Sequence, residues 1–149
     1  MELYHLGRAK FARQLSGEGA RLHGGRWNLI GTPCLYTSAA RSLCVLEFAA
    51  NVPLDEMSDD LVFTVYEIPD GSWTEISLKD LPLGWMENSS PGIVKEWGTK
   101  QLRQHLALKL PSVIIPSEFN FLLNPLHIDF RKVAIKAVES FTFDKRIKQ

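Results

Sequence analysis

The sequence has few of the features that mark membrane-spanning, secreted or metal-binding proteins. It contains no run of about 18 apolar residues, the length that a membrane-spanning helix needs, and its first ten residues lack the apolar segment of a secretion signal. The only cysteines, Cys34 and Cys44, lie in segments expected to be buried, which predicts reduced core thiols and favours a cytoplasmic protein. The four histidines are scattered without the spacing of metal ligands, so no metal site is predicted.

The chain also lacks an excess of charge of either sign. Seventeen basic residues balance seventeen acidic ones, so direct binding to nucleic acid or to an acidic membrane surface is not expected, and a nuclease finds little support. The apolar fraction of 45% and the charged fraction of 23% are typical of globular proteins. With 149 residues and no repeats, linkers or low-complexity tracts, the sequence predicts one mixed α/β (α+β) domain over residues 1–149.

Apolar patterning predicts short strands and helices in alternation. The strands are expected at residues 3–6, 33–37, 61–68, 111–116 and 132–143, the last as one strand or as a pair. The helices are expected at residues 8–15, 39–51 and 90–106, and the loops at residues 17–31, 73–91 (with one helical turn near Leu78) and 119–125. Ser38 and Ser90 are the expected N-caps of the second and third helices, and Gly98 could interrupt the third. The segment at 61–68 is apolar on both faces, which predicts a central strand.

The segment from Ser16 to Asn51 is the part of the chain where chemistry is most expected. Five of the ten glycines fall between Gly17 and Gly31, although their spacing fits neither the dinucleotide fingerprint nor the phosphate-binding loop. Glycine spacing alone therefore leaves an ordinary irregular loop as an alternative. Arg26 directly follows two glycines and favours a ligand-binding loop, because arginine binds phosphate bidentately.

Glu47 is the residue of this segment that most strongly indicates a function. Its helical neighbours are almost all apolar, and a carboxylate in such surroundings needs a partner or a function. An ion pair with Arg26 or Arg21 that merely holds the loop is one explanation. The other is a reaction through a sugar cation, which a partly desolvated carboxylate stabilises. Tyr36, eleven residues earlier at the end of a strand, could border the same cleft, although on its own it is simply a half-buried aromatic.

Three segments resemble the RES domain family, which is named for an arginine, a glutamate and a serine. They are SGEGARLHGGRWNLIGTPCLYTSAARSLCVLE from Ser16, LKLPSVIIP from Leu108 and NFLLNPLHIDF from Asn120. Arg26, Glu47 and Ser112 are similar to the three family residues, with Ser117 as an alternative serine, and Tyr36 is similar to the site tyrosine of the family.

The resemblance implies a split mixed β-sheet like that of ADP-ribosyltransferases, with NAD as the substrate and no metal. It also implies the toxin of a toxin–antitoxin pair, neutralised by an Xre-type helix-turn-helix antitoxin, and leaves open a homodimer within that complex. Tyr36, Arg26 and Glu47 are then the expected catalytic residues. The expected NAD-binding residues are His5, Arg21, Asn28, Ser112 and Asn120. From the residues alone, Asn120 and Asn124 could bind a ligand through hydrogen bonds, but an ordinary loop role is the default expectation for both.

The first strand departs from the family pattern. Relatives often begin with Leu-Tyr-Arg, whereas this chain has Leu3-Tyr4-His5. If the arginine of the relatives binds a phosphate, His5 would bind it more weakly near neutral pH, unless Arg8 or Arg21 replaces that arginine. The resemblance implies hydrolysis or phosphorolysis of NAD, or transfer of ADP-ribose to a protein. The alternative outside the enzymes is a catalytically inactive interaction module, in which Arg26 and Glu47 form a structural ion pair.

Overall fold

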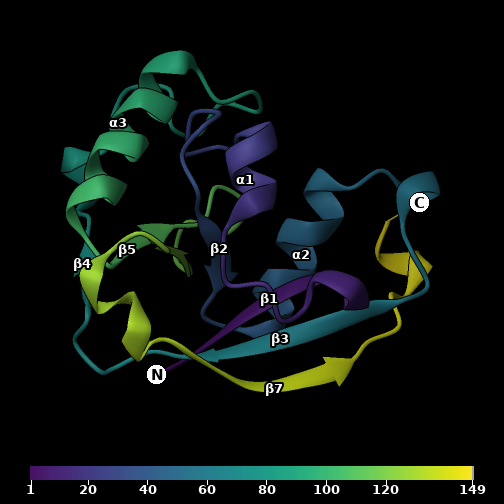
Figure 1. The fold of residues 1–149 in the computed structure, drawn as a ribbon. Coiled ribbons are helices and arrows are strands. Elements are labelled where there is room, and N and C mark those ends of the chain that lie inside the picture. Colours follow the sequence, from purple (N-terminus) through teal and green to yellow (C-terminus); the bar gives the residue numbers. More distant parts are fainter. Residues whose placement is uncertain (149) are drawn as a thin grey trace.

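The computed structural model describes residues 1–148 and shows one seven-stranded sheet (Figure 1). The order of the strands across the sheet is β4-β5-β6-β2-β1-β3-β7. The strands are β1 (Glu2–Arg8), β2 (Leu35–Ser38), β3 (Leu61–Glu67), β4 (Trp73–Glu75), β5 (Ala107–Pro111), β6 (Phe119–Leu123) and β7 (Ala134–Ser140). Because β4 and β5 are parallel while the other pairs are antiparallel, the sheet is mixed, and the predicted fold class is confirmed.

The α-helices of residues 1–148 lie on one side of this sheet, as Figure 1 shows. They are α1 (Glu18–His23), α2 (Arg41–Asn51) and α3 (Gly92–Gln104). Short 3-10 turns occur at Ala9–Phe11, Leu54–Glu56, Leu78–Asp80, Ile128–Lys132 and Lys145–Ile147. The helical turn expected near Leu78 is therefore confirmed.

The sheet is split between β1 and β2. These two strands share a single register pair, Tyr4 opposite Ser38, whereas β1 and β3 pair along their whole length from Glu2 to Arg8. One half of the sheet is thus β4-β5-β6-β2 and the other is β1-β3-β7, joined at one point.

Separate apolar clusters place the helices over the two halves. Leu108 and Leu122 of β5 and β6 pack with Val94 and Leu102, which seats α3 on the first half. Cys44 of α2 packs with apolar side chains of β1 and β3, including Leu6 and Phe63, which seats α2 on the second half. Helices α3 and α2 therefore cover different halves of the sheet, one on each side of the split.

Several expected elements of the N-terminal half were predicted correctly and others were wrong. The strands at residues 3–6 and 61–68 are confirmed as β1 and β3. Six residues of β3 are buried, as expected for a well-covered strand, but β3 is the second strand from the edge of the sheet rather than central. The helix expected at 8–15 is only a 3-10 turn, and the loop expected at 17–31 contains α1. Ser38 does not cap α2, because the N-cap position is Ala40 and the hydroxyl of Ser38 donates to Asn120 instead.

The C-terminal half contains the larger errors. The strand expected at 111–116 ends at Pro111, and the loop expected at 119–125 is mostly strand β6, which pairs with both β2 and β5. The loop expected at 73–91 also begins with strand β4. Helix α3 runs through Gly98 without interruption, and the hydroxyl of Ser90 donates to a backbone carbonyl of the glycine loop rather than capping this helix.

Both cysteines are buried free thiols, as predicted. Burial raises the pKa of Cys34 well above its usual value and that of Cys44 to about 12. Along residues 1–148, no helix combines the length and the apolar character that crossing a membrane requires.

Candidate active site

Glu47 reaches the sheet from the buried side of α2. It lies one turn after Leu43 and Cys44, both buried, so its side chain shares their face of the helix. The half-buried carboxylate accepts two short hydrogen bonds at Oε1, one from the Ser112 hydroxyl at 2.7 Å and one from the Asn120 amide at 2.6 Å. Within residues 1–148 no partner is found for Oε2, which leaves that oxygen able to face a ligand.

Ser112 is the serine that contacts this carboxylate. It follows β5, is fully buried, and accepts hydrogen bonds from the backbone N–H groups of Ile114 and Ile115 at 3.0 and 3.1 Å. A hydroxyl has two acceptor positions and one proton, so its proton is left to point at Glu47. Ser117, the alternative from the sequence, is exposed in the following turn.

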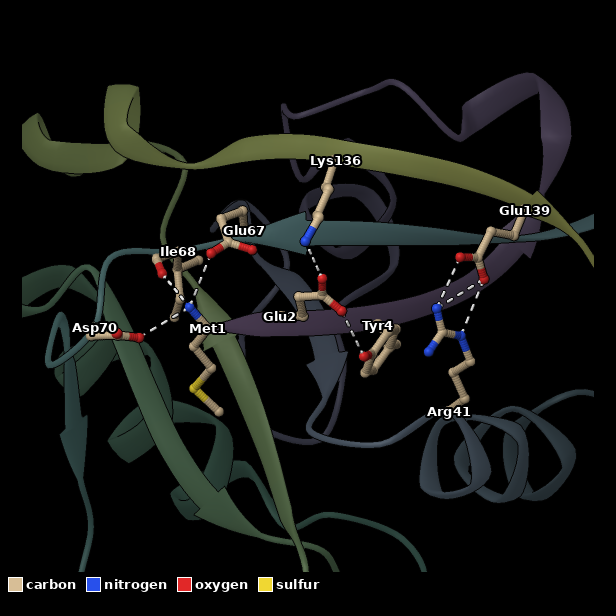
Figure 2. Close-up of polar contacts among 9 residues, drawn as sticks. All are labelled: Met1, Glu2, Tyr4, Arg41, Glu67, Ile68, Asp70, Lys136 and Glu139. Atoms are coloured by element: carbon tan, nitrogen blue, oxygen red, sulfur yellow. Dashed lines mark hydrogen bonds and ion pairs between the residues drawn. The ribbon is translucent and has the colours of Figure 1, made fainter.

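The start of α2 is anchored by polar contacts to the second half of the sheet (Figure 2). The Arg41 guanidinium donates to both carboxylate oxygens of Glu139 on β7 and lies 4.3 Å from the centre of the Tyr4 ring on β1. The Tyr4 hydroxyl donates to Glu2, which also pairs with Lys136. Because Arg41 begins the helix that carries Glu47, these contacts help to fix where the carboxylate points.

The glycine loop is organised around Asn28 and Tyr36. Asn28 is fully buried, and its amide nitrogen donates to the backbone carbonyls of Ala20, Leu29 and Thr32 at 2.9, 3.2 and 3.0 Å. Its side-chain oxygen accepts a 2.7 Å hydrogen bond from the Tyr36 hydroxyl.

Tyr36 completes this network from β2. Its hydroxyl accepts from the backbone N–H of Trp27 at 3.0 Å while it donates to Asn28. Burial raises the pKa of Tyr36 well above its usual value, so the phenol keeps its proton. Tyr36 and Asn28 therefore hold the loop in shape from inside the protein.

Arg26 is braced by the segment that precedes α3. Its Nη1 donates to the carbonyls of Trp85 and Glu87 at 3.2 and 2.6 Å, and its Nη2 donates to the carbonyl of Asn88 at 3.2 Å. No partner for Nε is found in the described part of the chain. Three of the five N–H groups are thus engaged, and the Nε N–H and one Nη2 N–H are left as donors for a ligand such as phosphate.

The two clusters are connected by one face of β2. Tyr36, which holds the glycine loop, and Ser38, which contacts Asn120, are two residues apart and therefore point to the same side of the strand, about 6 to 7 Å apart. The ion pair between Glu47 and Arg26 or Arg21 is not formed among the described residues. Arg21 pairs with Glu18 inside α1, and Arg26 binds backbone carbonyls.

His5 lies at the split of the sheet. Its Nδ1 is 2.9 Å from the carbonyl oxygen of Tyr36, beside the single point where β1 and β2 pair. A carbonyl only accepts, so Nδ1 carries the proton. The His5 side chain is exposed, and partial desolvation by the neighbouring residues lowers its pKa below the ordinary value.

The structure thus brings together Glu47, Ser112 and Asn120 in one cluster, and Arg26, Tyr36 and Asn28 around the glycine loop. The side chain of Arg21 takes part in neither cluster and instead pairs with Glu18. Ser38 belongs to the first cluster and was missed as a site residue, because only the pairing of β2 with β6 places it opposite Asn120. No short sequence pattern indicates that β2 pairs with β6.

Comparisons with known proteins agree with the resemblance seen in the sequence. The family model described as the RES domain matches residues 2–144. A protein called Toxin Res from Photorhabdus laumondii is 34% identical over 152 residues, covering 99% of this chain and 97% of that protein. A protein called Prs ADP-ribosylating toxin, from Sphingobium sp., is 30% identical over 141 residues, covering 91% of this chain and 88% of that protein.

A solved structure has a similar fold despite low sequence identity. It is the crystal structure of the MbcT–MbcA toxin–antitoxin complex of M. tuberculosis, matched with a TM-score of 0.73 and 15% identity. The match covers 95% of this chain and 84% of that one. At this level of identity the likeness supports the fold alone.

Proposed function

Because the chain belongs to the RES domain family, we propose that it is a toxin that cleaves the bond between nicotinamide and ribose in NAD. The observation that carries this proposal is the Glu47 carboxylate, held by two short hydrogen bonds at Oε1 with Oε2 unpartnered in the described chain. A fixed carboxylate in a partly desolvated place is suited to stabilising positive charge as it develops.

The proposed reaction needs no metal and no redox step. The C1′–N1 glycosidic bond breaks, and its electron pair moves to the pyridinium nitrogen, so that neutral nicotinamide leaves and positive charge develops on the ribose. Glu47 stabilises this ribosyl cation. The oxygen of water, or of phosphate, then bonds to C1′. Water loses one proton to solvent, and the product is ADP-ribose or its phosphate ester.

The remaining site residues are proposed to bind and orient NAD. Arg26 offers its remaining Nε and Nη2 N–H groups to the diphosphate, in an orientation held by the three carbonyls. Tyr36 borders the nicotinamide end with its ring while its hydroxyl holds the loop. Asn28 is fully buried and supports the loop from within, and Ser112 and Asn120 act at the ribose side through Glu47.

Transfer of ADP-ribose to a protein is the second candidate. It is supported by the relative whose name describes an ADP-ribosylating toxin. The site chemistry is the same up to the ribosyl cation, and only the acceptor differs. The proposed partner of the chain is an Xre-type helix-turn-helix antitoxin, and the solved structure of similar fold comes from a toxin–antitoxin complex.

Two labelled forms of NAD test the proposal and separate the candidates. The purified protein is incubated with NAD labelled in the nicotinamide or in the adenylate half. Free nicotinamide together with free ADP-ribose or its phosphate supports degradation, and adenylate label on a protein band supports transfer. Glu47→Gln should lower the rate by about 10²- to 10³-fold, as expected for loss of a charge-stabilising group. The matched control is Glu96→Gln on the exposed side of α3, which should keep the wild-type rate.

The inactive-module alternative predicts a different result. NAD would then leave the melting temperature unchanged, whereas a ligand at 100 times its dissociation constant stabilises a protein by about 2.7 kcal/mol. Absence of both nicotinamide release and thermal stabilisation would overturn the proposed function.

A further inference from the structure

We propose that Ser38 is a positioning residue, which fixes the direction of the Glu47 carboxylate by fixing the amide of Asn120. This inference rests on the proposed function, because it assigns the residue that orients the proposed charge-stabilising group. Ser38 does not contact Glu47 itself in the hydrogen-bond network.

The first step of the argument is the register of β2 and β6. Ser38 and Asn120 are opposite each other on these antiparallel strands, so their side chains project from the same face. Ser38 is only 3% exposed, and its hydroxyl donates a 2.7 Å hydrogen bond to Oδ1 of Asn120.

The second step is the polarity of the Asn120 amide. An ionised carboxylate only accepts hydrogen bonds, so Nδ2 of Asn120 must face Glu47, to which it donates at 2.6 Å. The amide oxygen then faces Ser38, whose hydroxyl satisfies it. The order of donors is therefore Ser38 to Asn120 and Asn120 to Glu47.

The third step is what this chain of hydrogen bonds does to Glu47. Without Ser38, the amide would be held at one end only and could rotate about its last side-chain bond, which has a broad torsional preference. With it, Asn120 joins Ser112 in holding Oε1 from two directions, so the direction of Oε2 is fixed. A fixed charge costs no reorganisation when the positive charge develops, so the effect is expected on kcat rather than on KM.

Three variants test this role by kinetics. Ser38→Ala should lower kcat for NAD cleavage about five- to tenfold, as expected for one hydrogen bond, with KM changed less than about twofold. Ser38→Thr keeps the hydroxyl on a β-branched side chain suited to a strand, and should recover most of the rate. The matched control is Ser72→Ala, because the Ser72 hydroxyl is buried without a hydrogen-bond partner among residues 1–148. It should leave both constants unchanged.

A spectroscopic readout keeps this inference separate from the proposed function. The side-chain amide signal of Asn120 in a ¹⁵N-labelled sample is assigned by its loss in Asn120→Asp. In Ser38→Ala this signal should shift and its protons should exchange faster with solvent, while the backbone spectrum elsewhere is retained. A wild-type protein that consumes no NAD but shows this change overturns the function and leaves the hydrogen-bond chain standing.

The opposite results overturn the inference itself. An unchanged Asn120 signal in Ser38→Ala would show that the serine does not hold the amide. A wild-type kcat in Ser38→Ala, or a higher KM with kcat unchanged, would show that the contact does not act on the chemical step.

Discussion

Ser112 and Glu47, separated by 65 positions in the chain, meet in a 2.7 Å hydrogen bond in which the serine is the donor. The acceptor positions of the same hydroxyl are taken by two backbone N–H groups. A hydroxyl engaged in this way has no free lone pair for attack on a carbon atom. The contact therefore argues for a serine that holds the carboxylate and against a serine nucleophile.

Ser112→Ala should lower both activity and stability. The variant removes one of the two donors to Oε1 and leaves the N–H groups of Ile114 and Ile115 without their acceptor. We expect kcat for NAD cleavage to fall at least tenfold and the free energy of unfolding to fall by about 1 to 3 kcal/mol, measured by urea denaturation. The matched control is Ser117→Ala in the exposed turn, which should change neither. Equal effects of the two substitutions would contradict this assignment.

His5→Arg should improve NAD binding. Desolvation lowers the pKa of His5 from its usual 6.5, so at pH 7.5 the ring is neutral and offers no positive charge to a phosphate. An arginine would keep a donor for the Tyr36 carbonyl and add a permanent charge at the split of the sheet.

The expected result is a KM for NAD that is about five- to tenfold lower, as for one charge-assisted hydrogen bond. His5→Gln is the control, because glutamine can donate to the carbonyl without a charge. If both variants give the same KM, the charge at this position does not act on NAD.

The parts of the fold that could be predicted are those with strong local signals. Strand β3 is apolar on both faces, and six of its seven residues are buried, so both of its faces are covered. The lone acid of α2 was recognisable because its helical neighbours are apolar, and the structure turns it to the sheet.

The parts that could not be predicted depend on contacts between distant segments. The sequence from Val113 to Ile115 is apolar like a strand, but its backbone N–H groups bind the Ser112 hydroxyl and form a turn. Asn120 looks like a loop residue, yet it lies in β6, where its polar side chain is satisfied by Ser38 and Glu47. Neither environment is visible without the pairing of β6 with β2 and β5.

Tyr36→Phe should destabilise the protein through the glycine loop. The variant removes the partner of both the Trp27 N–H and the Asn28 side-chain oxygen, while the ring is kept. We expect a loss of about 2 kcal/mol in the free energy of unfolding, measured by urea denaturation. Tyr66→Phe is the matched control, because this buried tyrosine forms no hydrogen bond through its hydroxyl among residues 1–148. A loss of the same size in both variants would show that the loop network does not contribute.

Gly98 allows α3 to lie directly against the backbone of the loop that carries Arg26. A Cβ at this position would lie 2.1 Å from the carbonyl oxygen of Trp27, far inside van der Waals contact, so either the helix or the loop must move. Gly98→Ala should therefore cost about 1 to 3 kcal/mol of stability, the usual penalty of overpacking. It should also lower NAD cleavage, because the displaced segment includes the neighbour of Arg26.

Gly92→Ala is the matched control in the same helix. A Cβ there meets nothing within 4 Å, and alanine restricts the unfolded chain and favours the helix, so this variant should be equally stable or more stable by up to about 1 kcal/mol. Thermal unfolding and NAD turnover of the two variants would be compared directly. The two substitutions are expected to change stability in opposite directions, because only Gly98 is in contact with the loop. If the Gly98→Ala protein were as stable and as active as the Gly92→Ala protein, the position of the loop would not depend on this contact.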